Sequence, residues 1–274
     1  MSPPPSYSPE DYFDIINELN GNGVIPILVA GQAVNLWAKR FIQWDTQNGK
    51  LSPKLTTFAP FTSDDMDILR GDKLENYLSL QSLRSKEIPE PFGKAFSPDL
   101  ATLWFEDSQK RKLKIQIMGS VLGLDYFSAN PPLIAMKDQK RGISLKVLDP
   151  ISLLQCKTAN LFEIPNKRDK DYKHLQILIR CIPAYIDEAY KASKNARGIL
   201  KLINRIEDYS DSKYAKKLAI NHKIDWSCLL PWEQLEQAAK SSESIANFLN
   251  IEAPRWHKRL QDNSNKRTPG IRPY

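Results

Sequence analysis

Two aspartates at alternate positions are the residues of this sequence whose types and spacing best fit metal chemistry. Asp65 and Asp67 belong to a short segment, residues 62–68. If that segment forms a strand, both carboxylates share one face and lie about 6.5–7 Å apart at the backbone. Because paired Mg²⁺ ions in phosphoryl-transfer sites lie about 3.5–4 Å apart, the two side chains can hold one or two ions. The alternative is a solvated acidic loop that also includes Asp64.

Gly31 lies upstream of the aspartates, where a strand is expected to run into a helix. Residues 25–29 are apolar and predict a buried strand, and from residue 33 the apolar positions recur at helical spacing. A glycine at such a junction lets a phosphate approach the backbone N–H groups at the positive end of the helix. Gly31 taken alone favours a plain helix-start turn. Its order with the aspartates favours a site for a metal ion and phosphates.

The elements predicted around these residues form an α+β (α/β) arrangement. A helix capped by Ser8 is expected over residues 8–20, where glycines end it. Alternating or continuous apolar residues predict strands at 25–29, 65–69, 101–105, 112–118, 133–136 and 143–148. A short helix is expected at 73–82, and polar or proline-rich composition predicts loops at 44–61 and 87–99.

From residue 150 onward the pattern becomes helical. Helices are expected at 151–161, 172–185, 196–206, 213–219, 232–239 and 243–249. We therefore predict an N-terminal domain with a mixed sheet and flanking helices at 1–149. An all-helical C-terminal domain follows at 150–262, and a basic flexible tail at 263–274.

The composition is that of a globular protein. The chain has 274 residues, of which 41% are hydrophobic. Its three cysteines lie far apart, which argues against a zinc site or a disulfide framework and fits a reducing cytoplasm. We expect no signal peptide in the proline-rich start, and no apolar run is long enough to predict a membrane span. The expected location is the cytoplasm.

Positive charge is concentrated in the second half of the chain. Residues 151–274 contain 22 Lys and Arg against 14 Asp and Glu, a net charge of +8. Residues 1–150 contain 17 against 18, a net charge of −1. This asymmetry fits a C-terminal half that faces RNA, DNA or a nucleotide, and it fits solvated helix faces equally well.

The order of these motifs resembles the nucleotidyltransferase superfamily. Residues 30–38 and 63–67 look like its small-residue helix opening and its Asp-x-Asp strand. The branch that they most resemble is the bacterial minimal or AbiEii-like group, several members of which act as toxins or antitoxins. Residues 147–157 are similar to the proline-led helix with a basic residue in that branch, and 170–175 to its later Arg-Asp-x-x-Asp-Leu helix. The resemblance spans roughly residues 24–180.

The resemblance implies a mechanism. Asp65 and Asp67 would hold Mg²⁺ on the phosphates of an NTP, and a hydroxyl of RNA (such as tRNA) or of a protein would attack the α-phosphate with loss of pyrophosphate. The protein would then be a toxin–antitoxin or phage-defence component, with a cognate partner protein as one possible ligand. The further residues that the resemblance assigns to the nucleotide, its phosphates or an assisting cation are Gly31, Gln32, Ser63, Lys157 and Lys170.

Two positions depart from the family pattern. Gln32 stands where a second glycine or serine is usual, although the AbiEii-like branch often has glutamine after two small residues. The third carboxylate of active members corresponds to Gln116, a neutral side chain that is a poor Mg²⁺ ligand. Either two acids suffice, Glu106 or Asp107 substitutes, or catalysis is impaired. The alternative functions are a catalytically degenerate nucleotide-, protein- or RNA-binding module, and a basic nucleic-acid-binding protein whose α/β half is scaffold.

Overall fold

The computed structural model describes residues 5–71, 73–74, 86–87, 99–124, 132–164 and 168–265. The chain divides into two compact units. The first unit comprises Met1–Arg40 and Phe58–Asn160, and the second comprises Phe41–Thr57 and Leu161–Tyr274. This division differs from the predicted boundary at residue 150. The predicted domain boundaries stay a prediction, because compact packing does not test independent folding.

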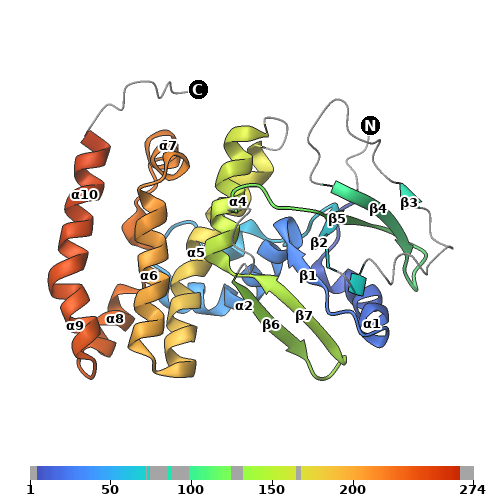
Figure 1. The fold of residues 1–274 in the computed structure, drawn as a ribbon, viewed down its shortest axis with the longest axis horizontal. Coiled ribbons are helices and arrows are strands. Elements are labelled where there is room, and N and C mark those ends of the chain that lie inside the picture. The colour runs from blue at the N-terminus through green and yellow to red at the C-terminus, as the bar shows by residue number, and fades with distance from the viewer. Residues whose placement is uncertain are drawn as a thin grey trace. The chain divides into compact units, whose positions relative to one another are not determined.

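The first unit is built on a seven-stranded mixed sheet with the order β3-β4-β5-β2-β1-β7-β6 (Figure 1). Strand β1 is antiparallel to β2 and parallel to β7, and β2 is parallel to β5. The outer pairs β3–β4, β4–β5 and β6–β7 are antiparallel. The strands are β1 Ile27–Val29, β2 Asp65–Leu69, β3 Lys86–Glu87, β4 Asp99–Glu106, β5 Lys112–Met118, β6 Leu133–Asp138 and β7 Ile143–Leu148.

Short polar side chains fix where the N-terminal helices of this unit begin. A 3₁₀ turn, Pro9–Tyr12, leads into α1, Phe13–Gly21. The Ser8 backbone N–H donates to the Asp11 carboxylate at 2.7 Å, which completes a capping box. After α1 the chain turns at Gly23, whose φ of 73° is a left-handed conformation that favours glycine. The remaining helices that begin here are α2, Ala30–Asn48, and α4, Pro150–Glu163.

The second unit is helical throughout its described elements. Asn195, Ser212 and Ser242 each accept a backbone N–H from the first turn of the helix that follows. No helix in the described ranges is long and apolar enough to cross a membrane. The elements are the 3₁₀ turn Leu55–Phe58, α5 Arg168–Ser193, α6 Ala196–Ser210, α7 Lys213–His222, the 3₁₀ turn Trp226–Leu229, α8 Trp232–Ala239, α9 Glu243–Asn247, the π-turn Phe248–Glu252 and α10 Ala253–Asn265.

The predicted fold class is confirmed: a mixed sheet with helices is followed by a helical region. The predicted loop at 44–61 is wrong at its start, because α2 continues to Asn48. Asp45, four residues after the buried Phe41, is itself buried, and its carboxylate accepts the Leu55 N–H at 2.6 Å. A buried carboxylate that caps the next turn cannot be recognised from polarity alone.

The sequence analysis also missed α10. Its apolar pattern is sparse, with Ala253 and Trp256 buried among mostly polar residues, so periodicity does not reveal it. The first residues of the predicted tail, 263–265, are helical, and 266–274 lie outside the described residues. The predicted helix at 73–82 and the predicted loop at 87–99 also lie mostly outside them.

The start of α4 offers a direct test of local capping. The Asp149 carboxylate is fully buried and accepts the N–H groups of Ile151, at 2.9 Å, and Ser152, at 3.2 Å. We expect Asp149→Ala to lower the free energy of unfolding by about 1–2 kcal/mol, since these N–H groups lose their acceptor. Asp149→Asn keeps an acceptor oxygen and should lose less. Urea unfolding of both variants measures the difference, and equal losses would contradict a capping role.

Candidate functional site

Strand β2 carries both aspartates on one face of the central sheet. Met66 and Ile68, on the other face, are 0% and 1% exposed and belong to the core. Asp67 is 8% exposed, whereas Asp65 is partly exposed. The alternation of apolar and acidic side chains therefore holds β2 in one orientation, because turning it over would bury both carboxylates in the core.

Helix α2 begins beside the acidic end of β2. Val29, the last residue of β1, pairs with Asp67, and α2 starts at the next residue, Ala30. The first turn of a helix presents N–H groups without intrahelical acceptors and the positive end of the helix dipole. An anion bound next to the two carboxylates would thus meet these N–H groups, provided that a cation offsets the carboxylates.

The tight turn between β1 and α2 is made by Ala30 and not by Gly31. Ala30 has a φ of 53°, in the left-handed region, and Gly31 is the second residue of α2. The predicted strand-to-helix junction is present, but its strained residue is an alanine. Gly31 lies in the first helical turn, where a contact with phosphate stays a prediction.

The Gln32 side chain is fully buried and holds the N-terminal segment in place. Its amide nitrogen donates to the Tyr7 carbonyl at 2.8 Å, and its amide oxygen accepts from Asn35 at 3.3 Å. Tyr7 also exchanges two backbone hydrogen bonds of 2.8 Å with Ser63. A phosphate contact at Gln32 would therefore come from its backbone, and this assignment stays a prediction.

Ser63 connects the N-terminal segment to the first aspartate. Its side chain is 1% exposed, and its hydroxyl lies 3.4 Å from an Asp65 carboxylate oxygen, a long hydrogen bond. Ser63 thus orients Asp65 from the residue two positions earlier. Its predicted contact with the nucleotide is not tested by this geometry.

Tyr12 belongs to the site and was missed in the sequence analysis. Its side chain is 0% exposed, and no group among the described residues makes a hydrogen bond with its hydroxyl. Burial, and then the charges of Asp65, Tyr7 and Asp67, raise the pKa of Tyr12. The nearby Gln32 side chain lowers this pKa, but by less. The hydroxyl is therefore a protonated donor close to both aspartates. No sequence signal marks it, because it lies in a 3₁₀ turn more than fifty residues before them.

Strand β5 places two polar side chains directly beside the aspartates. In the parallel register, Lys114 pairs with Asp65 and Gln116 pairs with Asp67, so all four side chains share one face. Gln116 is therefore the side chain next to Asp67, and its match to the third acid of the family stays a prediction. Lys114 was not assigned a role in the sequence analysis. The alternation of 112–118 placed it on the polar face, but the sequence does not reveal which strand lies next to β5.

The two predicted assisting lysines lie in different units. Lys157 lies on α4 in the first unit and is 6% exposed. Lys157 is therefore not a surface lysine. Because an ammonium group stays buried only where nearby groups compensate its charge, Lys157 has a defined electrostatic role. Lys170 is partly exposed on α5 in the second unit, and its role stays a prediction.

The proposed substitute acid Asp107 is already engaged. One carboxylate oxygen accepts the N–H groups of Gln109 and Arg111, and the other accepts the Arg111 guanidinium at 2.7 Å. Burial works to raise the pKa of Asp107, but these hydrogen bonds hold it below its usual value. Asp107 thus closes the turn between β4 and β5. Glu106 is exposed and pairs with Lys112.

The donor set of the site fits a magnesium ion that shares its coordination with a ligand. The described residues contain no group of three or more His, Cys, Asp and Glu side chains placed to hold a metal ion. Mg²⁺ usually keeps several waters and is bound by one or two carboxylates together with substrate phosphates. Asp65 and Asp67 meet that requirement. Gln116 can add an amide oxygen but no charge.

Comparisons with known proteins identify one fold-level likeness. No protein-family model matches the sequence, and no curated protein matches it either. The structure is similar to the crystal structure of an antigenic nucleotidyltransferase-like protein from Paracoccidioides brasiliensis, with 10% sequence identity and a TM-score of 0.39. The match covers 72% of this chain and 95% of that one. A likeness this distant does not bear on the chemistry of this chain.

The Tyr12 hydroxyl provides a test of the site geometry. We expect Tyr12→Phe to leave the free energy of unfolding unchanged or to raise it by up to about 1 kcal/mol, because a buried hydroxyl without a partner costs free energy. Tyr214→Phe is the control, since it removes a hydroxyl that donates to Glu163 at 2.7 Å and should be neutral or destabilising. Urea unfolding measures both. A loss above about 1 kcal/mol for Tyr12→Phe would show that its hydroxyl has a partner in the free protein.

Proposed function

We propose that this protein is a Mg²⁺-dependent nucleotidyltransferase that transfers a nucleotide from an NTP to a hydroxyl of RNA or protein. The observation that carries the proposal is the placement of Asp65 and Asp67 on one face of β2, beside the start of α2. Two carboxylates hold a cation, and a helix N-terminus favours an anion. A metal-bound triphosphate combines both.

The residues of the chain divide the work of such a reaction. Asp65 and Asp67 would hold the ion, and the first turn of α2, including Gly31 and Gln32, would meet the terminal phosphates through backbone N–H groups. When bound, Mg²⁺ supplies charge neutralisation and orientation for the phosphates. The Tyr12 hydroxyl is a buried donor that a ligand oxygen can accept. Lys114 adds a positive charge beside Asp65.

The acceptor and the biological setting are the least constrained part of the proposal. The positive charge of residues 151–274 favours RNA over a neutral acceptor. A role in a toxin–antitoxin or phage-defence system follows from the family resemblance alone. Lys157 and Lys170 are proposed as cations for the nucleotide or the acceptor, and Lys157 has the stronger support because it is buried in the same unit as β2.

A labelling assay tests the function. Purified protein with Mg²⁺ and each α-³²P-labelled NTP, with or without total bacterial RNA, should transfer label to RNA or to protein. We expect Asp65→Ala/Asp67→Ala to lose at least about a hundredfold of this activity, since the metal ligands are removed. Asp64→Ala is the matched control, because Asp64 is an exposed aspartate just before β2. Equal activity in the double variant and the control would refute the assignment.

A second candidate function is a catalytically degenerate nucleotide-binding module, favoured by Gln116 beside Asp67. This form would bind Mg²⁺–NTP through the same carboxylates without transferring label. It could also present the bound nucleotide to a protein or RNA partner.

The Gln116 position can be tested by restoring an acid. We expect Gln116→Asp to raise Mg²⁺ affinity by about tenfold in calorimetric titration, since a third carboxylate adds charge at the site. Gln109→Asp, in the exposed β4–β5 turn, is the control for added charge. If both variants bind Mg²⁺ as the wild type does, Gln116 is not at a ligand position. New label transfer by Gln116→Asp alone would identify the wild type as degenerate.

A further inference from the structure

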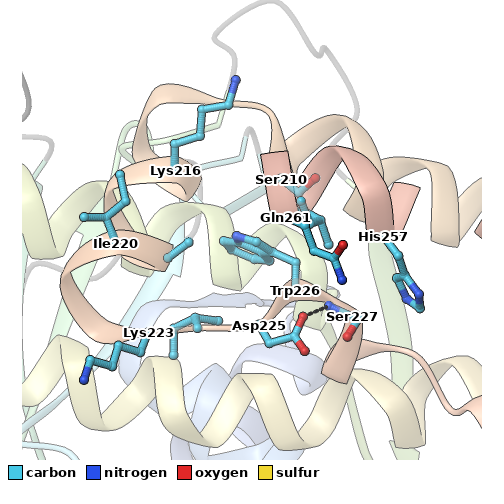
Figure 2. A pocket seen from close by; sticks show the side chains of 12 residues that line it. Ser210, Lys216, Ile220, Lys223, Asp225, Trp226, Ser227, His257 and Gln261 are labelled. Atoms are coloured by element: carbon cyan, nitrogen blue, oxygen red, sulfur yellow. Dashed lines mark hydrogen bonds between the residues drawn. The ribbon is translucent and has the colours of Figure 1, made fainter. Parts of the chain in front are cut away.

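The helical unit contains a cavity that the proposed function does not use. It has a volume of about 620 Å³ and lies between the α7–α8 segment and the C-terminal helix α10 (Figure 2). Small-molecule sites typically measure about 300–1,000 Å³, so the cavity has room for a compact organic ligand. The side chains that line it are Ser210, Lys216, Ala219, Ile220, Lys223, Ile224, Asp225, Trp226, Ser227, His257, Leu260 and Gln261.

The Trp226 indole N–H is an unpaired donor in the wall of this cavity. The side chain is 2% exposed, and no described residue accepts a hydrogen bond from its Nε1. Two other tryptophans of the unit are paired: Trp232 donates to the Ser227 carbonyl at 2.9 Å, and Trp256 donates to the Ser210 hydroxyl at 3.1 Å. A buried donor without an acceptor costs about 1–3 kcal/mol, and a ligand that supplies an acceptor atom would remove this cost.

The Trp226 ring is held in a fixed orientation. It packs edge to face against Tyr209, with ring centroids 5.6 Å apart and an interplanar angle of 88°. Figure 2 shows the ring among the lining side chains, between Ile220 and Gln261, whereas the His257 ring is turned away from it. His257 instead packs against Trp232 at 5.0 Å. The His257 Nε2 also lacks a partner among the described residues, and the indole is the one of these two ring systems that lies among the other lining side chains in Figure 2.

The charges of the lining favour an anion. Two lysines, Lys216 and Lys223, line the cavity together with one aspartate, Asp225. The Lys216 ammonium also lies 3.7 Å from the Asp211 carboxylate, so part of its charge is already balanced. The Asp225 carboxylate accepts the Ser227 N–H at 2.9 Å as the cap of a 3₁₀ turn, which occupies part of its negative charge. Lys223 ends α7 with a φ of 54°, a left-handed conformation in which glycine is favoured. A lysine thus stands beside the cavity where local geometry would prefer glycine.

The rest of the lining is apolar. Ile220 is 40% exposed, and Ile224 and Leu260 line the same cavity. An inorganic anion would leave this surface uncovered, whereas a planar or aliphatic group attached to the anion would cover it. The lining therefore combines a cationic part, an unpaired indole N–H and an apolar part.

We propose that this cavity binds a phosphate ester with an aromatic body, of the size of a nucleoside monophosphate. The phosphate contacts Lys216 and Lys223, the aromatic group packs on Ile220, and an acceptor atom of the ligand takes the Trp226 N–H. A free nucleotide and the terminal nucleotide of an RNA present the same chemistry. The site is separate from the aspartates of β2, and the inference stands or falls independently of the proposed transferase activity.

The test follows the indole N–H of Trp226 in ¹H–¹⁵N spectra of the full chain. The signal that disappears in Trp226→Phe is assigned to Trp226. EDTA removes divalent cations, so that the aspartates of β2 do not bind a metal–nucleotide complex during the titration. The probes are AMP, adenosine, ribose 5-phosphate and a 5′-phosphorylated oligoribonucleotide. We expect a downfield shift of the Trp226 indole proton with AMP or the oligonucleotide, and a weaker effect of the probes that lack the base or the phosphate.

Charge variants locate the phosphate. Lys216→Ala and Lys223→Ala should each weaken binding by about tenfold, since each removes a charge-assisted contact. Lys217→Ala is the matched control on α7, because the Lys217 ammonium lies over the Phe162 ring. Binding of AMP identifies a free nucleotide as ligand, and binding of the oligonucleotide alone identifies an RNA end. The proposal would be overturned by a Trp226 signal that no probe shifts, or by equal losses of AMP affinity in Lys216→Ala and Lys217→Ala. Loss of AMP binding in Asp65→Ala/Asp67→Ala would also overturn it.

Discussion

The repulsion between Asp65 and Asp67, on one face of the central strand β2, is the interaction that the surrounding part of the first unit must offset. Like unit charges about 6.5 Å apart repel by on the order of 2–3 kcal/mol at an effective dielectric constant near 20. The neighbourhood of β2 lowers that cost: Lys114 pairs with Asp65, and α2 begins beside the same end of the strand. A bound cation would lower it further. The site is thus arranged to be more favourable with a metal ion than without one.

The N-terminal segment lies beside the start of β2, where its hydrogen bonds hold it. The Tyr7 backbone pairs with Ser63 just before β2, and the Tyr7 carbonyl also accepts a hydrogen bond from the Gln32 side chain on α2. Tyr7 thus links the N-terminal segment to both β2 and α2. Tyr12, five residues later, lies close enough for the charges of both aspartates to raise its pKa. Gln32 therefore has a structural task, whatever contact its backbone makes with a ligand. A substitution at Gln32 would affect both the position of the segment and the site.

In the second unit, several helix starts and two of the indole groups have hydrogen-bond partners. Its helices begin at Asn195, Ser212 and Ser242, and the indoles of Trp232 and Trp256 are paired. The Trp226 N–H is one of several buried polar groups of this unit without a partner among the described residues, and it lies at a cavity that also contains two lysines. Native structures satisfy most buried polar groups, and we propose that a ligand satisfies this one.

The sequence by itself determined what depends on local chemistry. The alternation in 112–118 predicted β5, the Ser8 cap predicted the first helix, and the spacing of Asp65 and Asp67 placed both on one face of a strand. These inferences succeed because side-chain alternation and capping involve residues within a few positions of one another. The change from strands to helices near residue 150 follows from periodicity in the same way.

The tertiary structure decided which distant residues meet. That Gln116 lies beside Asp67, that Lys114 lies beside Asp65 and that Tyr12 is buried near both depends on strand order and register, which arise from packing across the whole sheet. Likewise, only the packed chain distinguishes the buried Lys157 from a surface lysine and the unpaired Trp226 from its paired neighbours. Burial and pairing are properties of the surroundings of a residue, and those surroundings are made by parts of the chain that are remote in sequence.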